Sequence, residues 1–466
     1  MAAHVKPVLD PDIYRRLDAM RAREERAFAS RTTKSAQWLE QARTRMPDGV
    51  PMSWMRGLYR HLPVVAVEGS GSSFRDLDGN SYVDFNLCDL SMAAGFAHPA
   101  IAAAVTEQAA RGNQFLLPTA DALDVCALLS ERFPLPQWQF TLSASGANTD
   151  ALRLARSVTE RRAIVVFDGK YHGQLDQTLW SPDGGRLARE GLGLDPASGD
   201  STTVLPYNDV DALRARLRTG DVAAVLLEPT LTNCGLVLPT PEFVAALNED
   251  VRGNGALLVV DETHTQFAVH GGGTRRFGFR PDIITGGKGI AGGVAIGVFG
   301  MTDDLGAFLA DHRADDPGTR TVGDSTGVAT GGTLYGNALS MAAARAGLRE
   351  VFTEEGAQRV DTLAGRLQAL LQQHIDSAGQ DWTIDRFGGR LQWRLTPDPP
   401  LTGADSWQSI DLPFVDTRRI HFANRGVWEA IATSGPSISF AATAEDVSRY
   451  AEVAAEFLGE LFADPA

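Results

Sequence analysis

Short apolar runs alternate with helical patterns from about Gln139 onward, and this alternation constrains the fold more than any other feature of the chain. The runs are rich in Val, Ile, Leu and Ala, and they cover residues 163–167, 222–227, 256–260, 283–284 and 294–299. Helical patterns lie between them, at residues 149–161, 210–217 and 241–251. Strands that are buried on both faces and separated by helices are typical of a mostly parallel sheet. The sequence therefore predicts an α/β fold with this sheet in a large domain.

Two of the apolar runs lead into residues with useful chemistry. Asp261 follows the run 256–260, and Lys288 stands in GGKGIAGG, shortly after the run 283–284. Ligand-binding residues of parallel sheets lie just beyond the carboxyl ends of the strands. A lysine among glycines at such a place is suited to form an imine, and an acid there can hold a protonated pyridine nitrogen. Pyridoxal 5′-phosphate (PLP) needs these two groups from a protein.

The length and charge of the chain limit the classes of function. A chain of 466 residues is too long for one hydrophobic core, so we expect two or three structural units. The formal net charge of −15 disfavours nucleic acid or an anionic membrane as the main partner. No apolar run approaches the roughly 20 residues that span a bilayer, and the amino-terminal residues lack the apolar core of a signal peptide.

The cysteines and histidines indicate a reducing compartment and no metal. Cys88, Cys126 and Cys234 lie far apart without zinc-site spacing, which suits a cytoplasmic protein. His264 and His270 are poorly spaced for a metal site, so we expect none.

The chain is expected to divide into three parts. The first part, residues 1–85, is expected to contain helices and strands and to belong to the small domain and to the dimer contact. The large PLP-binding domain is expected at residues 86–345, and a carboxyl-terminal α+β domain at residues 346–466. Asp78-Gly79-Asn80 is a hairpin signal between short strands. Further helices are predicted at residues 10–29, 35–45, 101–111, 120–133, 337–352, 357–378 and 444–462, and further strands at 382–384 and 390–395.

A segment of small residues, Ser143–Asn148, precedes the predicted helix 149–161. Its residues Ala144, Ser145 and Gly146 would let the backbone approach an anion at the positive end of the helix. Small polar residues at a helix start are also ordinary caps, and this alternative stays open. The segment does not match the GxxxxGK[ST] phosphate loop of nucleotide enzymes.

Other residues could complete a cofactor site. Tyr171 follows a strand and could stack on a planar ring, although taken alone a tyrosine at this place is more often a rim residue. The neighbouring His172 is more often a structural hydrogen-bonding residue than a base. Glu228 ends a strand at the same sheet edge as Asp261 and Lys288. Gly332 and Thr333, in TGGTLYGN, could bind a second set of phosphate oxygens.

Six motifs follow one another along the chain: SASGANTDALRLAR at 143–156, YHG at 171–173, EP at 228–229, DE at 261–262, PD with GK at 281–288, and GGTLYGNA at 331–338. Their order and spacing resemble the class III (omega) aminotransferases of PLP fold type I. The resemblance covers nearly the whole chain. Within that group it is nearest to glutamate-1-semialdehyde aminomutase and its aminotransferase relatives.

The resemblance implies roles for these residues. Lys288 would form the Schiff base and then transfer a proton, Asp261 would keep the pyridine nitrogen protonated, and Tyr171 would stack on the ring. Gly332 and Thr333 would reach the phosphate from the neighbouring subunit, which implies a homodimer with a shared active site. The implied cofactor-binding residues are Ala144, Ser145, Gly146, Tyr171, His172, Glu228, Asp261, Thr263, His264, Lys288, Gly332 and Thr333.

Five positions depart from the family pattern. Ala144 replaces a glycine, Gly146 a glutamate, Thr263 a valine that packs under the ring, Leu334 a phenylalanine and Ala338 a proline. None of these changes removes a catalytic group, but they leave the substrate open.

The amino-terminal segment offers the few clues to the substrate. PDGVPMSWMRG supplies Arg56, near the place where the family has an arginine for a substrate carboxylate, and Arg60 follows. A two-pronged arginine contact would suit a carboxylate, although a surface arginine is an equal alternative. Trp54 and Ser91 would line the substrate pocket by family position.

The predicted function is that of a PLP-dependent aminotransferase, which moves an amino group between a small-molecule donor and a carbonyl acceptor by a ping-pong mechanism. A PLP-dependent aminomutase or an amino-acid epimerase is the alternative, because Lys288 and Asp261 serve all three. An NAD-binding enzyme would need GxGxxG after a first strand, and none stands there. A catalytically silent relative would have lost the lysine or the acid, and both are present.

Overall fold

The computed structural model describes residues 9–312, 327–431 and 433–463, which form two compact units. Unit 1 comprises residues 100–354 and 400–405, and unit 2 comprises the other described residues. The division into three domains with boundaries after residues 85 and 345 stays a prediction.

Unit 1 is built around a seven-stranded sheet with the strand order β4-β12-β11-β10-β9-β5-β8. Six strands share one direction, and β12 is antiparallel to both of its neighbours. The predicted mostly parallel α/β sheet is therefore confirmed. The strands are β4 (Gln137–Thr141), β5 (Ala163–Phe167), β8 (Thr202–Leu205), β9 (Val222–Leu227), β10 (Leu257–Asp261), β11 (Ile283–Gly286) and β12 (Gly297–Met301).

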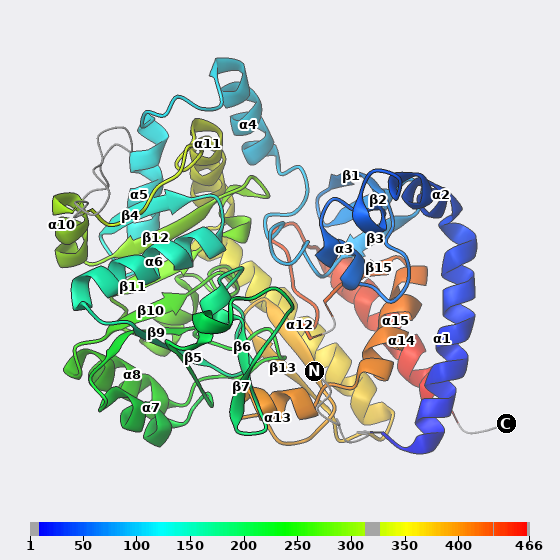
Figure 1. Ribbon diagram of the computed structural model, residues 1–466. Helices are drawn as coiled ribbons and strands as arrows, with labels where there is room; N and C mark the ends of the chain where they lie inside the picture. Colours follow the sequence, from blue (N-terminus) through cyan, green and yellow to red (C-terminus); the bar gives the residue numbers. More distant parts are fainter. Residues whose placement is uncertain (1–8, 313–326, 432, 464–466) are drawn as a thin grey trace. The chain divides into compact units, whose positions relative to one another are not determined.

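Helix α6 (Ala144–Thr159) lies across the sheet of unit 1 and packs its apolar side into the core (Figure 1). The predicted start at residue 149 is wrong, because Ser143 is the N-cap and its side chain accepts a hydrogen bond from the backbone N–H of Gly146. Residues 144–148 form the first turn of the helix and not a preceding loop.

The other helices of unit 1 surround the sheet, and a small hairpin follows β5. These helices are α4 (Pro99–Arg111), α5 (Ala120–Arg132), α7 (Val210–Leu217), α8 (Pro241–Gly253), α9 (Gly272–Phe277), α10 (Asp303–Asp311) and α11 (Ala338–Ala346), with short turns η2 (Asp176–Thr178), η3 (Pro196–Gly199) and η4 (Lys288–Ala291). The hairpin pairs β6 (Trp180–Asp183) with β7 (Arg186–Arg189). A π-helical turn, η5 (Gly347–Val351), continues α11, so the single helix predicted over 337–352 changes geometry near its end.

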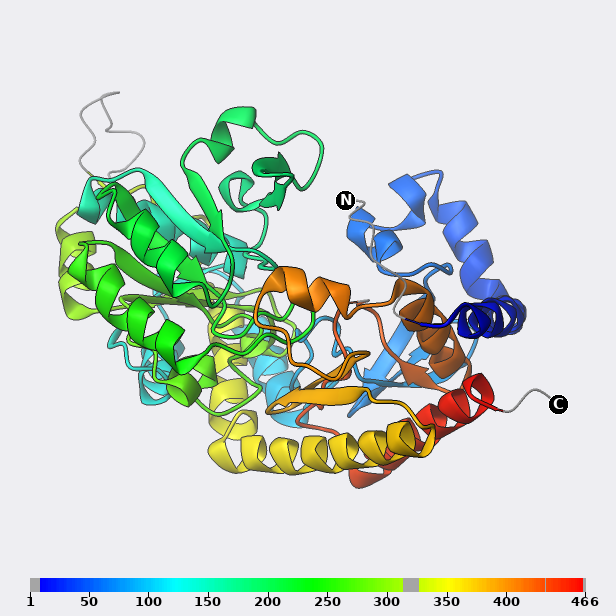
Figure 2. The ribbon, with the colours of Figure 1, turned by 90° about the horizontal axis from the view of Figure 1, so that it is seen from below.

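Unit 2 combines a four-stranded sheet and a hairpin with helices. The sheet has the order β1-β2-β3-β15, and β2 and β3 form the hairpin predicted around Gly79. The second hairpin, β13–β14, lies along the long helix α12 (Figure 2). Gln368 of α12 donates to the carbonyl oxygen of Ile384 in β13, and Gln372 donates to that of Trp382, just before β13. None of the described helices of the protein combines the length and apolar character that a bilayer crossing requires.

The elements of unit 2 include three helices that sequence patterns did not indicate, α3, α13 and α14. The strands are β1 (Ala66–Ser70), β2 (Ser73–Asp76), β3 (Ser81–Asp84), β13 (Thr383–Phe387), β14 (Arg390–Arg394) and β15 (Val427–Trp428). The helices are α1 (Pro11–Arg31), α2 (Thr33–Ala42), η1 (Pro47–Gly49), α3 (Ser53–Gly57), α12 (Glu354–Ser377), α13 (Gly403–Gln408, which begins in unit 1), α14 (Leu412–Asn424) and α15 (Ala444–Leu461).

Candidate active site

Three predicted site residues meet at one edge of the sheet of unit 1. Asp261 is the last residue of β10, and Lys288 follows the adjacent parallel strand β11 after Gly287. Glu228 directly follows β9, the neighbour of β10 on its other side. The parallel register therefore brings an aspartate, a lysine and a glutamate to the carboxyl ends of three consecutive strands, where α/β proteins bind their ligands.

The carboxylate of Asp261 is buried and receives four hydrogen bonds. Its Oδ2 accepts from Asn148 Nδ2 at 2.8 Å and from His172 Nδ1 at 2.9 Å, and its Oδ1 accepts from the Thr263 hydroxyl at 2.6 Å and the Thr263 amide at 3.1 Å. Burial raises the pKa of Asp261, but the hydrogen bond and charge of His172, with the other side-chain hydrogen bonds, hold that pKa below its ordinary value. Asp261 is therefore an ionised carboxylate at neutral pH.

Asn148 belongs to this cluster, and the sequence interpretation missed it. Its side chain is fully buried on α6, donates also to the carbonyl oxygen of His172 at 3.0 Å, and accepts from the Thr285 hydroxyl at 2.6 Å. The signal that could have found it is a polar residue on the apolar side of a helix, four residues before the buried Leu152. Asn148 thus ties α6 to β11 and to the acid.

The start of α6 lies beside the loop that carries the lysine and the loop that carries His172. A Cβ atom on Gly287 would come within 2.9 Å of the Ala144 nitrogen, and one on Gly173 within 2.1 Å of Ser145 Oγ, so both loops need glycine there. Ser145 Oγ accepts a hydrogen bond from the backbone of Gln174 at 3.0 Å. Because the first N–H groups of a helix have no partner within it, this helix start can bind an anion next to Lys288.

The backbone of Lys288 is left-handed, with φ +52°, which is uncommon for a residue with a side chain. Gln266 fixes this segment, because its Nε2 donates to the carbonyl oxygen of Gly287 at 2.8 Å and to that of Thr263 at 3.3 Å. One amide group therefore links the segment after Asp261 to the residue before Lys288. Gln266 was not among the predicted site residues.

Tyr171, Glu228 and His264 form a second network. The backbone N–H of Tyr171 donates to Glu228 Oε1 at 2.9 Å, while Tyr171 as a whole is 40% exposed. Glu228 Oε2 accepts from the Thr232 hydroxyl at 2.6 Å, and His264 Nδ1 lies 2.6 Å from the same hydroxyl oxygen. Burial raises the pKa of Glu228. The network holds the backbone of Tyr171 and leaves the tyrosine ring available for stacking.

Gly332 and Thr333 lie in an exposed segment just before α11. Gly332 packs against the Tyr335 ring, and the Thr333 carbonyl oxygen accepts a hydrogen bond from Gln114. Leu334, which follows them, is half exposed.

The predicted substrate residues Trp54, Arg56 and Ser91 belong to unit 2. Trp54 is 49% exposed, and Arg56 donates through one terminal nitrogen to the carbonyl oxygens of Tyr59 at 2.9 Å and His61 at 3.3 Å. Ser91 donates to the Cys88 carbonyl oxygen at 2.9 Å. The roles proposed for these three residues stay predictions.

Comparison with known proteins identifies the family. The family described as Aminotransferase class-III matches residues 55–384. The chain belongs to the class-III aminotransferase family. The predicted resemblance is thereby confirmed.

The similarity to individual members of the class-III family extends over nearly the whole chain. Glutamate-1-semialdehyde 2,1-aminomutase 2 of Brevibacillus brevis is 31% identical over 440 residues, which are 92% of this chain and 99% of that protein. A variant of a glutamate-1-semialdehyde-aminomutase from Pseudomonas aeruginosa PAO1, solved in complex with PMP, has a TM-score of 0.90 and 35% identity over 96% of this chain and 98% of its own. A β-phenylalanine aminotransferase from Variovorax paradoxus has a TM-score of 0.81 and 30% identity, and the match covers 95% of this chain and 97% of that protein.

These similarities confirm PLP fold type I and PLP as the cofactor of this class-III protein. The residues in this structure fit PLP. Asp261 is ionised and can pair with a protonated pyridine nitrogen, and the α6 start can take a phosphate. His172 Nε2 is buried and, among the residues that the structure describes, has no hydrogen-bond partner, so the cluster has a polar atom left for a ligand.

Proposed function

We propose that this class-III enzyme is an aminotransferase that moves an amino group between an amino donor and a carbonyl acceptor by a ping-pong mechanism. The observation that supports its PLP chemistry is the ionised, buried Asp261 at the strand end next to the strand that leads to Lys288. PLP supplies an electron sink when it is bound, and this sink makes the bonds to the substrate α-carbon breakable.

Lys288 would be the catalytic base and acid. Its amine would hold the cofactor, and as a free amine it would accept a proton from the substrate α-carbon and return it to the substrate. The position of Lys288 is fixed by its two flanking glycines and by the hydrogen bond from Gln266 to Gly287. A fixed lysine can deliver the proton to one face of the substrate.

Asp261 would hold the proton of the pyridine nitrogen. A carboxylate with a lowered pKa accepts a hydrogen bond from that nitrogen without taking its proton, which keeps the ring positively charged. Ala144, Ser145 and Gly146 would bind the phosphate at the start of α6, and Tyr171 would stack on the ring. His172 would act through Asp261 as a positioning residue.

The active site is proposed to be shared between two copies of the chain. Gly332 and Thr333 are exposed, and they lie next to an exposed apolar patch that consists of Phe115, Leu116, Leu117 and Leu334. Gln114 connects the two parts of this patch through its hydrogen bond to the Thr333 carbonyl oxygen. An exposed apolar patch of this kind supports a protein interface, which would bring Gly332 and Thr333 to the phosphate of the partner copy.

A cytoplasmic location forms part of the proposal. Cys88, Cys126 and Cys234 all carry free thiols in the structure. Free thiols persist in reducing compartments, whereas oxidising compartments favour disulfides.

A 2,1-aminomutase is the second candidate, because the relatives that match over nearly the whole chain include proteins named as glutamate-1-semialdehyde aminomutases. The same Lys288 and Asp261 would serve that reaction, with donor and acceptor at two ends of one molecule. An epimerase would use them to remove and return one proton. The three reactions therefore differ in what is released and not in the residues required.

The first experiment tests for lysine-bound PLP by visible absorption. The wild-type protein should acquire a yellow band with PLP, Lys288→Ala should not, and Lys34→Ala, which removes an exposed lysine of α2, should behave as the wild type. A wild-type protein that binds no PLP would refute the proposal.

The second experiment separates the candidate reactions with a panel of amino donors. Stoichiometric release of a carbonyl compound from the donor supports the aminotransferase. Formation of a positional isomer without release supports the aminomutase, and loss of optical activity alone supports the epimerase. Either of the last two results would overturn the aminotransferase.

A further inference from the structure

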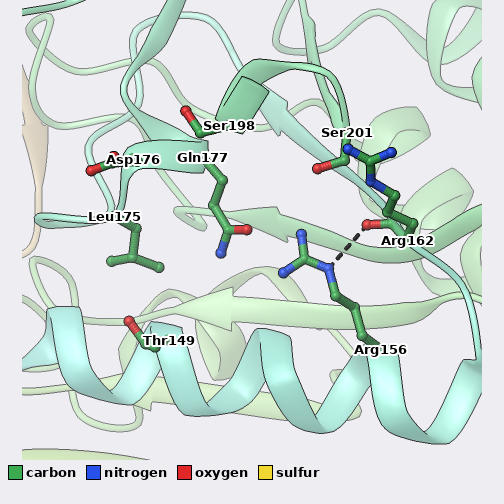
Figure 3. Close-up of a pocket in the computed structure, with 8 residues that line it drawn as sticks. All are labelled: Thr149, Arg156, Arg162, Leu175, Asp176, Gln177, Ser198 and Ser201. Carbon is green, nitrogen blue, oxygen red and sulfur yellow. Dashed lines mark hydrogen bonds between the residues drawn. The ribbon is translucent and has the colours of Figure 1, made fainter. Parts of the chain in front are cut away.

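A pocket of about 420 Å³ opens on unit 1 between α6, η2 and η3 (Figure 3). Its arginine end lies far from the start of α6, because Arg156 stands twelve residues after Ala144 and a helix rises about 1.5 Å per residue, or about 18 Å over this distance. At its other end, the Thr149 hydroxyl donates to the Ser145 carbonyl oxygen at 2.8 Å, so only the arginine end is distant from the place proposed for the cofactor phosphate. Its lining residues are Thr149, Arg156, Arg162, Leu175, Asp176, Gln177, Ser198 and Ser201.

Two arginines share one wall of this pocket. The guanidinium of Arg156 rises from α6, and its Nε donates to the carbonyl oxygen of Arg162 at 3.0 Å, which fixes its direction (Figure 3). Arg162 follows in the loop before β5 and lies beside Ser201 in the same view. Two arginines therefore line one part of the pocket in a protein whose formal net charge is −15.

No carboxylate neutralises this pair within the described residues. Neither arginine forms an ion pair there, in contrast to Arg153 on the same helix, which reaches Asp150 at 3.4 Å. Asp176 also lines the pocket, but it lies at the end opposite to the arginines in Figure 3. Its Oδ2 accepts a hydrogen bond from the backbone N–H of Asp195 at 3.4 Å. Burial and the charge of Arg162 both lower the pKa of Arg156.

The wall near the arginines carries further hydrogen-bonding groups. The Gln177 amide points into the pocket toward Arg156, and the Ser201 hydroxyl lies close to Arg162 (Figure 3). Guanidinium groups bind carboxylate and phosphate oxygens in pairs, and amide and hydroxyl donors complete such sites. The negative Asp176 would repel an anion at its own end, so the arginine end is the place for one.

We propose that this pocket is a binding site for a small oxyanion, a carboxylate or phosphate group of a small molecule, with Arg156 and Arg162 as its ligands. The site is independent of the proposed transamination, because it uses none of the residues around Lys288. Its volume admits a molecule larger than inorganic phosphate, so the anionic group is expected to belong to an organic compound.

Binding is tested by calorimetric titration of the PLP-loaded protein with inorganic phosphate and, separately, with succinate, at constant ionic strength set with sodium chloride. The loaded protein is used because the cofactor's own phosphate then occupies the start of α6. We expect saturable binding of at least one of the two probes, and which one binds identifies the anionic group. Heats for both probes that match the sodium chloride blank would overturn the proposal.

Variants locate the binding. Arg156→Met should weaken binding by about tenfold or more, the loss expected for one charge-assisted hydrogen-bonding group, whereas Arg153→Met, one turn earlier and already paired with Asp150, should leave it unchanged. Arg162 is exposed, so Arg162→Met tests the same site without disturbing packing if Arg156→Met does not fold. Binding that survives both pocket variants, or that is lost in Arg153→Met, would contradict the assignment.

Discussion

Thr263→Val isolates one hydrogen bond to the buried acid. Valine keeps the shape of threonine and the backbone N–H that donates to Asp261 Oδ1, and it removes only the hydroxyl at 2.6 Å. A hydrogen bond to a charged group contributes about 1.5–3 kcal/mol, and water cannot easily replace this one because Asp261 is 3% exposed. We therefore expect Thr263→Val to lower the free energy of unfolding of the cofactor-free protein by about 2 kcal/mol near neutral pH.

The effect should depend on pH in a defined direction. The pKa of Asp261 is lowered by folding, so its ionised form stabilises the fold above the ordinary aspartate pKa of 3.8, and this stabilisation is lost as the pH falls through the lowered value. Removal of the hydroxyl raises the pKa of Asp261. The difference between wild type and variant should be constant at neutral pH and should narrow as the pH falls below 3.8 toward the lowered pKa of the wild type.

The assay is urea unfolding of the two cofactor-free proteins at pH about 7 and about 3.5, with PLP affinity as a second measurement. Thr263→Ser keeps the hydroxyl and serves as the matched control, so it should retain most of the stability and the pH profile. Equal stability of wild type and Thr263→Val, or an equal loss in Thr263→Ser, would refute the reasoning about this hydrogen bond.

Three further predictions concern the supports of the site. Asn148→Leu breaks three buried hydrogen bonds and should lower the free energy of unfolding in urea by about 3 kcal/mol or more. Thr285→Val breaks one of the three and should lower it by less, and an equal loss in the two variants would show that Asn148 does not link these groups. Gly173→Ala has φ +91° and a clash with Ser145 Oγ, so it should lose about 2 kcal/mol and bind PLP more weakly, while Gly365→Ala in the open middle of α12 should gain up to about 1 kcal/mol. His172→Phe removes a donor to Asp261, so the pH at which bound PLP changes its visible spectrum should shift, and an unchanged spectral titration would exclude a positioning role.

Five of the seven strands of unit 1 could be predicted because their signal is local, whereas the two edge strands β4 and β8, which are only partly buried, were not predicted. The runs at β5 and β9 match the structure residue for residue, and the ends of β10 and β11 placed Asp261 and Lys288 at one edge. Strands buried on both faces are nearly all apolar, so their bounds can be located in the sequence.

Helix starts and buried polar residues were harder, because tertiary contacts decide them. The start of α6 was placed too late, since Ser143–Asn148 has the composition of a loop and only the cap at Gly146 shows that it is helical. Asn148 and Gln266 have partners distant in sequence, so no local pattern reveals their roles.

Helix α14 was missed for a related reason. It buries Arg418 and His421 along with its apolar residues, so its sequence lacks a clear apolar side. These polar groups are accommodated by acids from elsewhere in unit 2, with Arg418 paired to Glu429 at 3.0 Å and His421 Nδ1 lying 3.5 Å from Glu24. Buried charges require such partners, and the partners cannot be deduced from the helix alone.

The left-handed backbone of Lys288 has a consequence for evolution and for protein engineering. A residue with a side chain at φ +52° costs about 1 kcal/mol relative to glycine, so among variants that lack the amine Lys288→Gly should be more stable than Lys288→Ala by about that amount. Equal unfolding midpoints would show that the loop relaxes. Selection for stability alone would thus favour glycine at this position, and a lysine there marks a place where the chain has accepted a less stable fold to keep a reactive amine.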